Sequence, residues 1–488
     1  MSLLRPGAST TGYGEAGSDM RGSADAEARQ LIATALDDTL VVEAAAGTGK
    51  TTELVGRIVR ILAEGRTTVD KIVAVTFTEK AAGELKLRLR ERLDRERTAI
   101  QDENARQHLD LALTRLEEAH VSTIHGFCAA LLRERPVEAR IDPLFEVLTE
   151  DAAFRTFDDA FGRWLQEQLA GPPEGVRRAL RRTAFGGDDG PIDRLRNAAW
   201  ELAGWRDFTA DWTRNPFERE RAINETVDLL HEVADLTRTP SSRNDPLCTS
   251  TEPARRLSDE IRLQQEFGDS GRPDYDGWEA GLVDLSRDRV LGNVRHGRGA
   301  MYKDGVRRDM VLTAVDQLRS RLDQFRMDAD ADLAALLQRE LRGATARYET
   351  LKSAAGALDF LDLLVRARDL VCGNPLVRRG FQERFTHIFV DEFQDTDPLQ
   401  AEILLLLAAD DTAETDWRRV RPVPGRLFLV GDPKQSIYRF RRADVGIYRE
   451  VSQQLERHGA RLLRLNTSFR SVPEIQACVN AAFAPVNR

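Results

Sequence analysis

The sequence predicts an α/β fold in which a parallel sheet is interrupted by a large, mostly helical inserted domain. Two observations predict it. Short apolar, β-branched segments alternate with amphipathic helical segments near both ends of the chain, as in a doubly wound parallel sheet. Across residues 141–355 this alternation gives way to helical periodicity broken by polar loops. We therefore expect one sheet that begins before the insertion and resumes after it.

The elements before the insertion follow a disordered tail, which the Gly-, Ser- and Thr-rich composition of residues 1–24 predicts. Each expected strand is an apolar run of the kind buried in parallel sheets, and each is followed by a helix. In order, the expected elements are a helix at 26–36, a strand at 39–44, a helix at 51–63, a strand at 71–77 and a helix at 79–97.

The insertion, residues 141–355, contains no run of buried strands. Clusters of Pro, Ser, Asn and Asp predict loops at 186–191 and 239–253. One helical face of the insertion is strongly basic. Such a face either binds duplex DNA or is solvated, and solvation is the more common case. The arginines that form this face are Arg177, Arg178, Arg181 and Arg182.

Strand patterns return after the insertion. Expected strands at 386–391, 426–432 and 461–466 each precede a helical stretch. Residues 25–140 and 356–488 are therefore expected to form the first and second parts of one α/β domain.

Composition narrows the class of protein. The chain has 488 residues, of which 41% are hydrophobic and 31% charged, as in soluble globular proteins. No apolar run approaches the ~18 residues of a membrane helix, and residues 1–21 lack the apolar core of a secretory signal, so we expect a cytoplasmic protein. Four scattered cysteines without a CxxC pair argue against a cysteine-built metal site. The net charge of −9 argues against a nucleic-acid coat protein but not against a local nucleic-acid channel.

A Gly-rich loop between the first expected strand and its helix matches the phosphate-binding pattern G-x-x-x-x-G-K-[ST], except that Ala44 holds the first position. Gly47 and Gly49 would let backbone N–H groups surround phosphates. Lys50 would hold the β- and γ-phosphates of ATP, and Thr51 would bind Mg²⁺. A glycine turn with a chance lysine is the alternative, and the strand–loop–helix context argues against it. The expected nucleotide-binding residues are Ala44, Ala45, Ala46, Gly47, Thr48, Gly49, Lys50 and Thr51.

Two further strand ends supply groups that a phosphate loop needs. Asp391 and Glu392 follow an apolar run, where Asp391 would support Mg²⁺ and Glu392 would polarise the attacking water. Gln435 follows the strand expected at 426–432, where an uncharged amide can reach a γ-phosphate. Solvated acids and an ordinary strand-to-helix turn are the alternatives. The phosphate loop favours the functional interpretation of both segments.

Six segments occur in a fixed order and carry a resemblance. They are the phosphate loop, AVTFTEKAAGEL (74–85), STIHGF (122–127), VDEFQDTD (390–397), VGDPKQSIYRFRRAD (430–444) and NTSFRS (466–471). Together they resemble the UvrD/Rep-type superfamily 1 DNA helicases. The segments EAAAGTGKT and GDPKQSIYRF are most similar to the RecB/AddA-type helicase–nuclease subunits. The resemblance implies a RecA-like P-loop sheet for both parts of the α/β domain.

The resemblance also implies roles for individual residues. The implied catalytic residues are Glu392, Asp391, Gln435 and Arg470, and the implied Mg²⁺ ligands are Thr51 and Asp391. The implied DNA contacts are Thr76, Phe77, Thr78, Thr123, His125, Tyr438, Phe440 and Arg441. The adenine contact of the family lies upstream of the phosphate loop, where Gln30 is the candidate and Arg29 fits the spacing equally well.

The chemistry of one segment supports a DNA contact independently. Tyr438 and Phe440 alternate with arginines, and base–aromatic stacking contributes about 1–3 kcal/mol per base whatever the sequence. Core aromatic residues beside a solvated basic face are the alternative. Two residues depart from the family: Arg442 stands where Gly is frequent, and Ser468 stands where many members have Asn.

The resemblance implies the N-terminal motor half of an ATP-dependent DNA helicase or translocase, with 3′–5′ polarity on single-stranded DNA, in repair or recombination. ATP and Mg²⁺ are the implied cofactors. Single-stranded DNA and duplex junctions are the implied partners, and a second helicase–nuclease subunit is a further candidate. Only residues 471–488 follow Arg470, so we expect the second RecA-like half and a nuclease domain to be absent. The alternative is an ATP-responsive single-stranded DNA-binding module, or an inactive truncated product that needs a partner half.

Overall fold

The computed structural model describes residues 15–182, 190–213, 216–242, 244–267, 273–438, 442–470 and 472–483. The chain divides into two compact units. Unit 1 comprises Met1–Val147 and Leu358–Arg488, and unit 2 comprises Leu148–Ala357.

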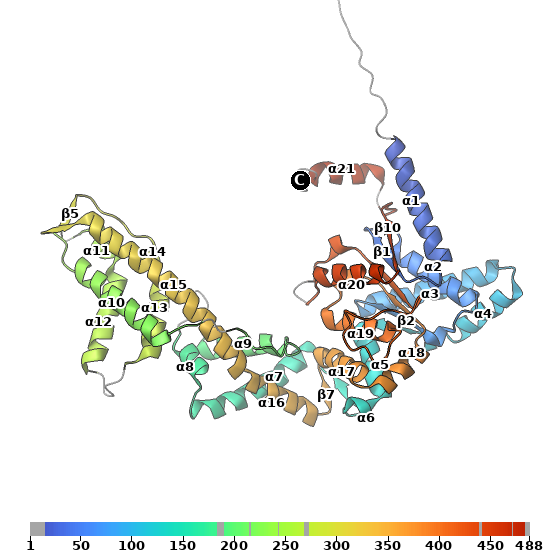
Figure 1. Ribbon diagram of the computed structural model, residues 1–488, viewed down its shortest axis with the longest axis horizontal. Coiled ribbons are helices and arrows are strands. Elements are labelled where there is room, and N and C mark those ends of the chain that lie inside the picture. The colour runs from blue at the N-terminus through green and yellow to red at the C-terminus, as the bar shows by residue number, and fades with distance from the viewer. Residues whose placement is uncertain are drawn as a thin grey trace, which may run out of the picture. The chain divides into compact units, whose positions relative to one another are not determined.

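Unit 1 contains a six-stranded sheet with the strand order β10-β1-β9-β8-β2-β3, and all neighbouring strands run parallel (Figure 1). Its strands are β1 (Leu40–Ala44), β2 (Ile72–Thr76), β3 (His120–Thr123), β8 (His387–Val390), β9 (Leu427–Gly431) and β10 (Arg461–Leu465). Strands from before and after the insertion interleave, since β9 and β8 lie between β1 and β2. The expected fold class, a parallel sheet interrupted by a helical insertion, is confirmed.

The sequence predicts five of these strands, and each of the five lies within one residue of its expected bounds. Strand β3 is not predicted. It is a polar four-residue segment, HVST, at the edge of the sheet, and three of its residues are partly exposed. An edge strand that is not buried on both faces does not produce the continuous apolar run that identifies a parallel strand.

Alternate strand residues build two separate cores, because successive side chains of a strand point to opposite faces. Val73 and Val75 of β2 pack into one core, and Ile72 and Ala74 pack into the other. One face is covered by α1 (Glu15–Thr34), α2 (Lys50–Ala63), α3 (Glu79–Ala99) and α4 (Glu103–Thr114). The other face is covered by α5 (Ile124–Glu134), α17 (Phe360–Gly373), α18 (Pro375–Arg384), α19 (Pro398–Ala408) and α20 (Val445–Arg457).

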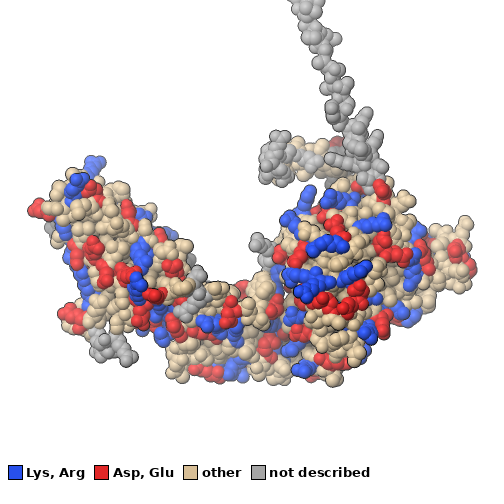
Figure 2. Space-filling model, in the orientation of Figure 1, with Lys and Arg blue, Asp and Glu red and all other residues tan. Residues whose placement is uncertain are grey.

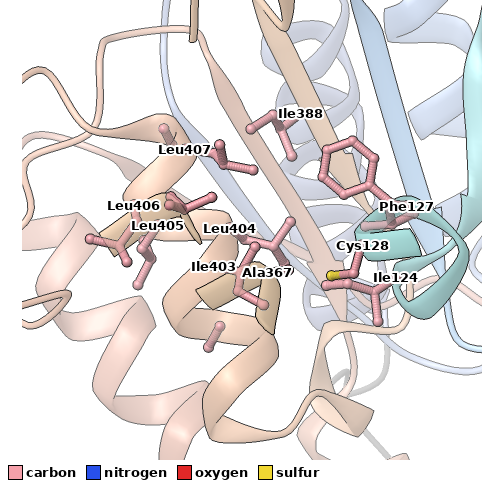
Figure 3. Packing of buried hydrophobic residues seen from close by; sticks show 14 of the residues in the cluster. Ile124, Phe127, Cys128, Ala367, Ile388, Ile403, Leu404, Leu405, Leu406 and Leu407 are labelled. Carbon is pink, nitrogen blue, oxygen red and sulfur yellow. The ribbon is translucent and has the colours of Figure 1, made fainter. Parts of the chain in front are cut away.

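Figure 3 shows part of the second core, where the side chains of α19 lie near Phe127 of α5 and Ile388 of β8. Every residue of α19 from Ile403 to Leu407 is buried, so this helix is apolar all round and is enclosed by the protein. The buried helix packs behind β8, whose carboxyl end carries the acidic residues expected in the site.

The shorter elements of unit 1 and its boundaries complete the fold. They are η1 (Val69–Lys71), η2 (Leu116–Glu118), α6 (Pro136–Ala139), β4 (Glu146–Val147), β7 (Ala357–Leu358), η3 (Phe393–Asp395), η4 (Pro433–Gln435) and α21 (Pro473–Phe483). Helix α1 begins at Glu15, within the segment expected as a tail, and ends two residues before the expected end of its helix.

Unit 2 is helical except for one hairpin. Its helices are α7 (Glu150–Leu169), α8 (Glu174–Arg181), α9 (Pro191–Ala203), α10 (Arg219–Thr237), α11 (Pro246–Ser250), α12 (Glu252–Phe267), α13 (Tyr275–Ser286), α14 (Arg289–Gly292), α15 (Arg308–Glu340) and α16 (Arg342–Ala354), and the hairpin is β5 (Met301–Lys303) with β6 (Val306–Arg307). The loop expected at 239–253 contains α11, which Asp245 caps. The loop expected at 186–191 lies mostly outside the described residues.

The four arginines around α8 do not form a solvated face. The Arg178 side chain is fully buried and pairs with Glu279 at 3.0 Å and with Asp332 at 2.7 Å. Arg182 is also buried and pairs with Glu279 at 2.6 Å. Only Arg181 is largely exposed. The expectation of a solvated face is wrong because the charges of Arg178 and Arg182 are compensated inside unit 2.

The surface of each unit mixes both signs of charge. On the face shown in Figure 2, Lys and Arg side chains are interspersed with Asp and Glu. A mixed face of this kind gives no extended basic field, as the net charge of −9 anticipates. Within the described ranges, no helix combines the length and the apolar character that crossing a membrane requires.

Candidate nucleotide site and nucleic-acid interface

The phosphate loop connects β1 to α2 and is shaped by two glycines. Gly47 and Gly49 have φ of +77° and +83°, in the left-handed region that favours glycine. A Cβ atom on Gly47 would lie 2.5 Å from the Cβ atom of Arg470, so the close approach of Arg470 also requires glycine there. Thr48 is buried and its hydroxyl donates to the carbonyl of Ala45 at 2.8 Å, which closes the loop on itself.

The first two residues of α2 contact the acids that follow β8. Lys50 Nζ donates to Glu392 Oε2 at 2.6 Å, and Thr51 Oγ1 donates to Asp391 Oδ2 at 3.0 Å. The sheet brings these residues together, since β1 and β8 end at the same edge. The Asp391 backbone N–H donates to the carbonyl of Val75 at 2.9 Å, which extends the β8–β2 pairing by one residue. Four residues of the expected nucleotide site therefore meet.

Asp391 and Thr51 have the chemistry of a magnesium site. Burial, followed by the neighbouring Glu392 carboxylate, raises the pKa of Asp391. A divalent cation would offset both effects by favouring the ionised form. Mg²⁺ is usually held by one or two carboxylates together with phosphate oxygens and water. Consistent with that mode, the described residues contain no cluster of three or more His, Cys, Asp or Glu side chains that could hold a metal alone. The two residues fit the ion.

Glu392 is held by a buried glutamine. Its backbone has φ of +56°, an uncommon conformation for a residue other than glycine, and such strain is concentrated at functional sites. Gln394 Nε2 donates to Glu392 Oε2 at 2.7 Å, and Gln394 Oε1 accepts from the backbone N–H of Asp432 at 2.8 Å. Gln435 Nε2 in turn donates to Asp432 Oδ2 at 2.6 Å. Hydrogen bonds thus link Lys50, through Glu392, Gln394 and Asp432, to Gln435.

Gln394 is a site residue that the sequence analysis misses. The signal for it is its place inside the motif VDEFQDTD, between two acids at a strand end. Its neighbour Asp395 lies in a cavity that Thr76 and His125 also line. Burial, followed by the Glu392 carboxylate, raises the pKa of Asp395 to about 6. This part of the site is therefore a poorly solvated, acid-lined space.

The segment after β10 crosses the phosphate loop. The Phe469 backbone N–H donates to the carbonyl of Gly47 at 2.8 Å, and the backbone N–H of Thr467 donates to the Asp25 carboxylate at 2.7 Å. This anchoring places Arg470 beside the loop, as its close approach to Gly47 shows. The Phe469 ring is 70% exposed. Phe469 is also missed by the sequence analysis, although an aromatic residue directly before Arg470 is a visible signal.

Arg29, and not Gln30, reaches the phosphate loop. An Arg29 amino group donates to the carbonyl of Thr48 at 2.7 Å, and the side chain is also paired with Glu53. The Arg29 guanidinium lies 5.3 Å from the centroid of the Phe469 ring. Gln30 is exposed on α1.

Phe77 and Tyr438 form an aromatic pair among the expected DNA contacts. Their ring centroids are 4.4 Å apart with an interplanar angle of 39°, and both side chains are partly exposed. Thr76 is buried at the end of β2. The Thr78 hydroxyl accepts from the backbone N–H of Ala81 at 3.1 Å, so Thr78 caps α3. The pair brings together two motifs that are far apart in the sequence.

The remaining expected DNA contacts have structural partners or lie outside the described part of the chain. Thr123 caps α5 and donates to Glu79 Oε1 at 2.7 Å. The His125 ring packs edge-on against Phe360, with centroids 5.5 Å apart, and burial lowers the pKa of His125 to about 4. The histidine is therefore neutral at physiological pH. Phe440 and Arg441 are outside the described residues.

Arg442 occupies a glycine-like backbone position. Its φ is +68°, which explains why a glycine would suit this position. The side chain pairs with Asp397 at 3.5 Å. The departure from the family pattern is thus accommodated by an ion pair to the segment that follows β8.

A phosphate loop on β1 that faces acids on β8, within an all-parallel interleaved sheet, defines a RecA-like nucleotide-binding domain. The family model of the UvrD/REP helicase N-terminal domain matches residues 24–456. The chain belongs to this family.

Several curated relatives share most of this chain, and each is described as the first subunit of an ATP-dependent helicase/nuclease. The relative from Pediococcus pentosaceus is 27% identical, over 92% of this chain and 38% of the relative. The relatives from Alkaliphilus metalliredigens and Staphylococcus aureus are 27% and 26% identical, over 93% and 94% of this chain and 39% of each relative. The chain spans about two fifths of the length of these relatives.

Proposed function

We propose that this chain is the ATP-binding motor half of an ATP-dependent DNA helicase or translocase that acts on single-stranded DNA with 3′–5′ polarity in repair or recombination. The observation that carries the proposal is the meeting of Lys50 with Glu392 and of Thr51 with Asp391. This arrangement places a phosphate-binding cation, a metal-binding pair and a water-activating carboxylate at one edge of one sheet.

Each side chain has a task in this proposal. The loop N–H groups and Lys50 bind the β- and γ-phosphates. Glu392 accepts a proton from the attacking water, with Gln394 fixing its carboxylate. Gln435 and Arg470 approach the γ-phosphate from two directions. Mg²⁺, held by Thr51 and Asp391, would neutralise phosphate charge.

The Phe77–Tyr438 pair supports the proposal for DNA. A partly exposed aromatic pair beside the nucleotide site offers a stacking platform for unpaired bases of any sequence. Because Tyr438 follows the segment that holds Gln435, nucleotide contacts and base contacts share one short stretch of chain. The curated relatives are described as subunits, so a second helicase–nuclease subunit belongs to the proposal, in the role of a partner.

Equilibrium binding tests the nucleotide site. A non-hydrolysable ATP analogue should bind the purified chain, and removing Mg²⁺ should weaken binding. Lys50→Ala should abolish it, whereas Lys80→Ala, at an exposed position on α3, should not. Equal binding by the wild type and Lys50→Ala would contradict the proposed site.

A second candidate function is an ATP-responsive single-stranded DNA-binding module, which the Phe77–Tyr438 pair also favours. Steady-state kinetics separates the two. We expect weak or no DNA-stimulated ATP hydrolysis by this chain alone and activity when the remaining motor half is supplied. Rapid hydrolysis with strand separation by this chain alone would refute the half-motor proposal. Binding without hydrolysis in the mixture would favour the binding module.

A further inference from the structure

The side of the phosphate loop opposite the acids carries an exposed aromatic ring. In the sheet, β10 flanks β1 on one side, and β9 and β8 follow on the other. Phe469 follows β10, whereas Asp391 and Glu392 follow β8. If the metal and γ-phosphate lie toward β8, as the proposed function requires, the base of the nucleotide extends toward Phe469. The ring is 70% exposed and offers a stacking face there.

Arg29 lies at the edge of this ring. Its guanidinium carbon is 5.3 Å from the ring centroid, so it covers only part of a ring that stays largely exposed. Two contacts fix the group, one to the carbonyl of Thr48 at 2.7 Å and one to the Glu53 carboxylate. The Arg29 side chain is 23% exposed, so part of it remains accessible.

Arginine offers a base only hydrogen-bond donors, because a guanidinium has five N–H groups and no acceptor. Guanine presents two acceptors, O6 and N7, on the same edge, and arginine can donate to both. Adenine presents one acceptor, N7, beside the N6 amino donor, so a guanidinium matches only half of that edge. A glutamine amide, with one donor and one acceptor, matches adenine instead.

We propose that Arg29 determines base selectivity in this site and that the site accepts guanosine triphosphate at least as tightly as adenosine triphosphate. This inference rests on the proposed function and extends its substrate class to purine nucleoside triphosphates. Phe469 supplies sequence-independent stacking, and Arg29 supplies the edge contact that distinguishes the two purines.

Competition binding tests the inference with the full chain. Non-hydrolysable ATP and GTP analogues are titrated against wild type, Arg29→Gln and Arg60→Gln in the presence of Mg²⁺. Arg60 is exposed at the far end of α2 and gives the same change of charge away from the ring. The wild type should bind the GTP analogue at least as tightly as the ATP analogue. Arg29→Gln should shift the Kd ratio toward ATP by about fivefold or more, and Arg60→Gln should leave it unchanged.

Each outcome has one meaning. Tighter binding of the ATP analogue by the wild type, or an unchanged ratio in Arg29→Gln, would overturn the role of Arg29 while the proposed nucleotide site stands. Equal shifts in Arg29→Gln and Arg60→Gln would overturn it as well, since the effect would then be one of net charge. If the folded wild type binds neither analogue, the proposed function itself fails, and this inference fails with it.

Discussion

The ammonium of Lys50 lies 2.6 Å from a carboxylate oxygen of Glu392. One cation is thus shared by two roles, because the group expected to hold the phosphates is paired with the group expected to activate water. A triphosphate and Glu392 compete for this ammonium. The competition affects how tightly nucleotide binds.

Glu392→Gln should therefore tighten binding of an ATP analogue while it prevents hydrolysis. The substitution removes the competing negative charge and the proton acceptor together. We expect a gain of about fivefold in affinity, on the order of 1 kcal/mol, because the pair is partly solvated. Isothermal titration measures it, with Glu64→Gln, which alters a surface ion pair, as the control. Weaker binding by Glu392→Gln would show that the carboxylate helps to orient Lys50.

Gln394→Leu should reduce the ability of the site to distinguish an ATP analogue from ADP. Gln394 links Glu392 to the backbone of Asp432, which in turn holds Gln435. Gln382→Leu is the matched control, since Gln382 is also buried but donates to the carbonyls of Leu406 and Ala409.

Both glutamine variants should lose about 1–3 kcal/mol of unfolding free energy, because each leaves buried polar groups without a partner. Hydrogen exchange in unit 1 measures that loss. Only Gln394→Leu should move the ratio of ADP to ATP-analogue Kd values toward one. A similar change in Gln382→Leu would assign the effect to general loosening of the core.

Phe77→Ala and Tyr438→Ala should each weaken binding of single-stranded DNA. Loss of one stacking contact costs about 1–3 kcal/mol. Because the rings touch, the double variant should lose less than the sum of the single losses. Fluorescence anisotropy with a labelled oligonucleotide at fixed salt measures binding. Phe267→Ala removes a ring that is 71% exposed in unit 2 and is expected to have no effect.

Arg178→Ala should destabilise unit 2 by about 3–5 kcal/mol, since it leaves Glu279 and Asp332 without their buried cation. Arg181→Ala, on the same helix, removes an exposed charge and should cost less than about 1 kcal/mol. Five of the six tryptophans lie in unit 2, so urea unfolding followed by tryptophan fluorescence reports mainly on this unit. Equal effects of the two variants would contradict the buried network.

Unit 1 should lose stability as the pH falls from about 6.5 to 4. Burial, followed by the nearby Arg57, lowers the pKa of His387 to about 4 from its usual value of 6.5. Between these values the unfolded chain binds a proton that the folded protein does not, so stability is full above pH 6.5 and declines below it. His387→Asn should reduce the acid-induced loss by about 2 kcal/mol. His458→Asn, at an exposed position after α20, should retain the loss in hydrogen-exchange measurements.

The sequence predicts the strands of the sheet better than their neighbourhood. A strand such as β2 is buried on both faces, and its apolar run is visible without any structure. Strand β3 is not visible, because an edge position permits the polar residues HVST. The role of Arg178 could not be predicted, since Glu279 and Asp332 lie 101 and 154 residues away in the sequence.

The site divides in the same way. Lys50, Thr51, Asp391 and Glu392 are expected together because parallel strands end at a common edge, and the structure brings them into contact. The choice between Arg29 and Gln30 depends on the rotation of α1 about its axis, which residue spacing alone does not specify. Their roles in catalysis and binding stay predictions.

The interleaved strand order has a consequence for synthesis on the ribosome. When β1, β2 and β3 emerge, the positions between β1 and β2 belong to strands that have not yet been translated. Unit 2 is continuous in sequence and can fold while the chain is still growing, because domains generally fold as units from the N-terminal side. The nascent sheet segments must wait through the whole of that interval with unpaired edges. We expect them to be the part of this protein that most depends on chaperones.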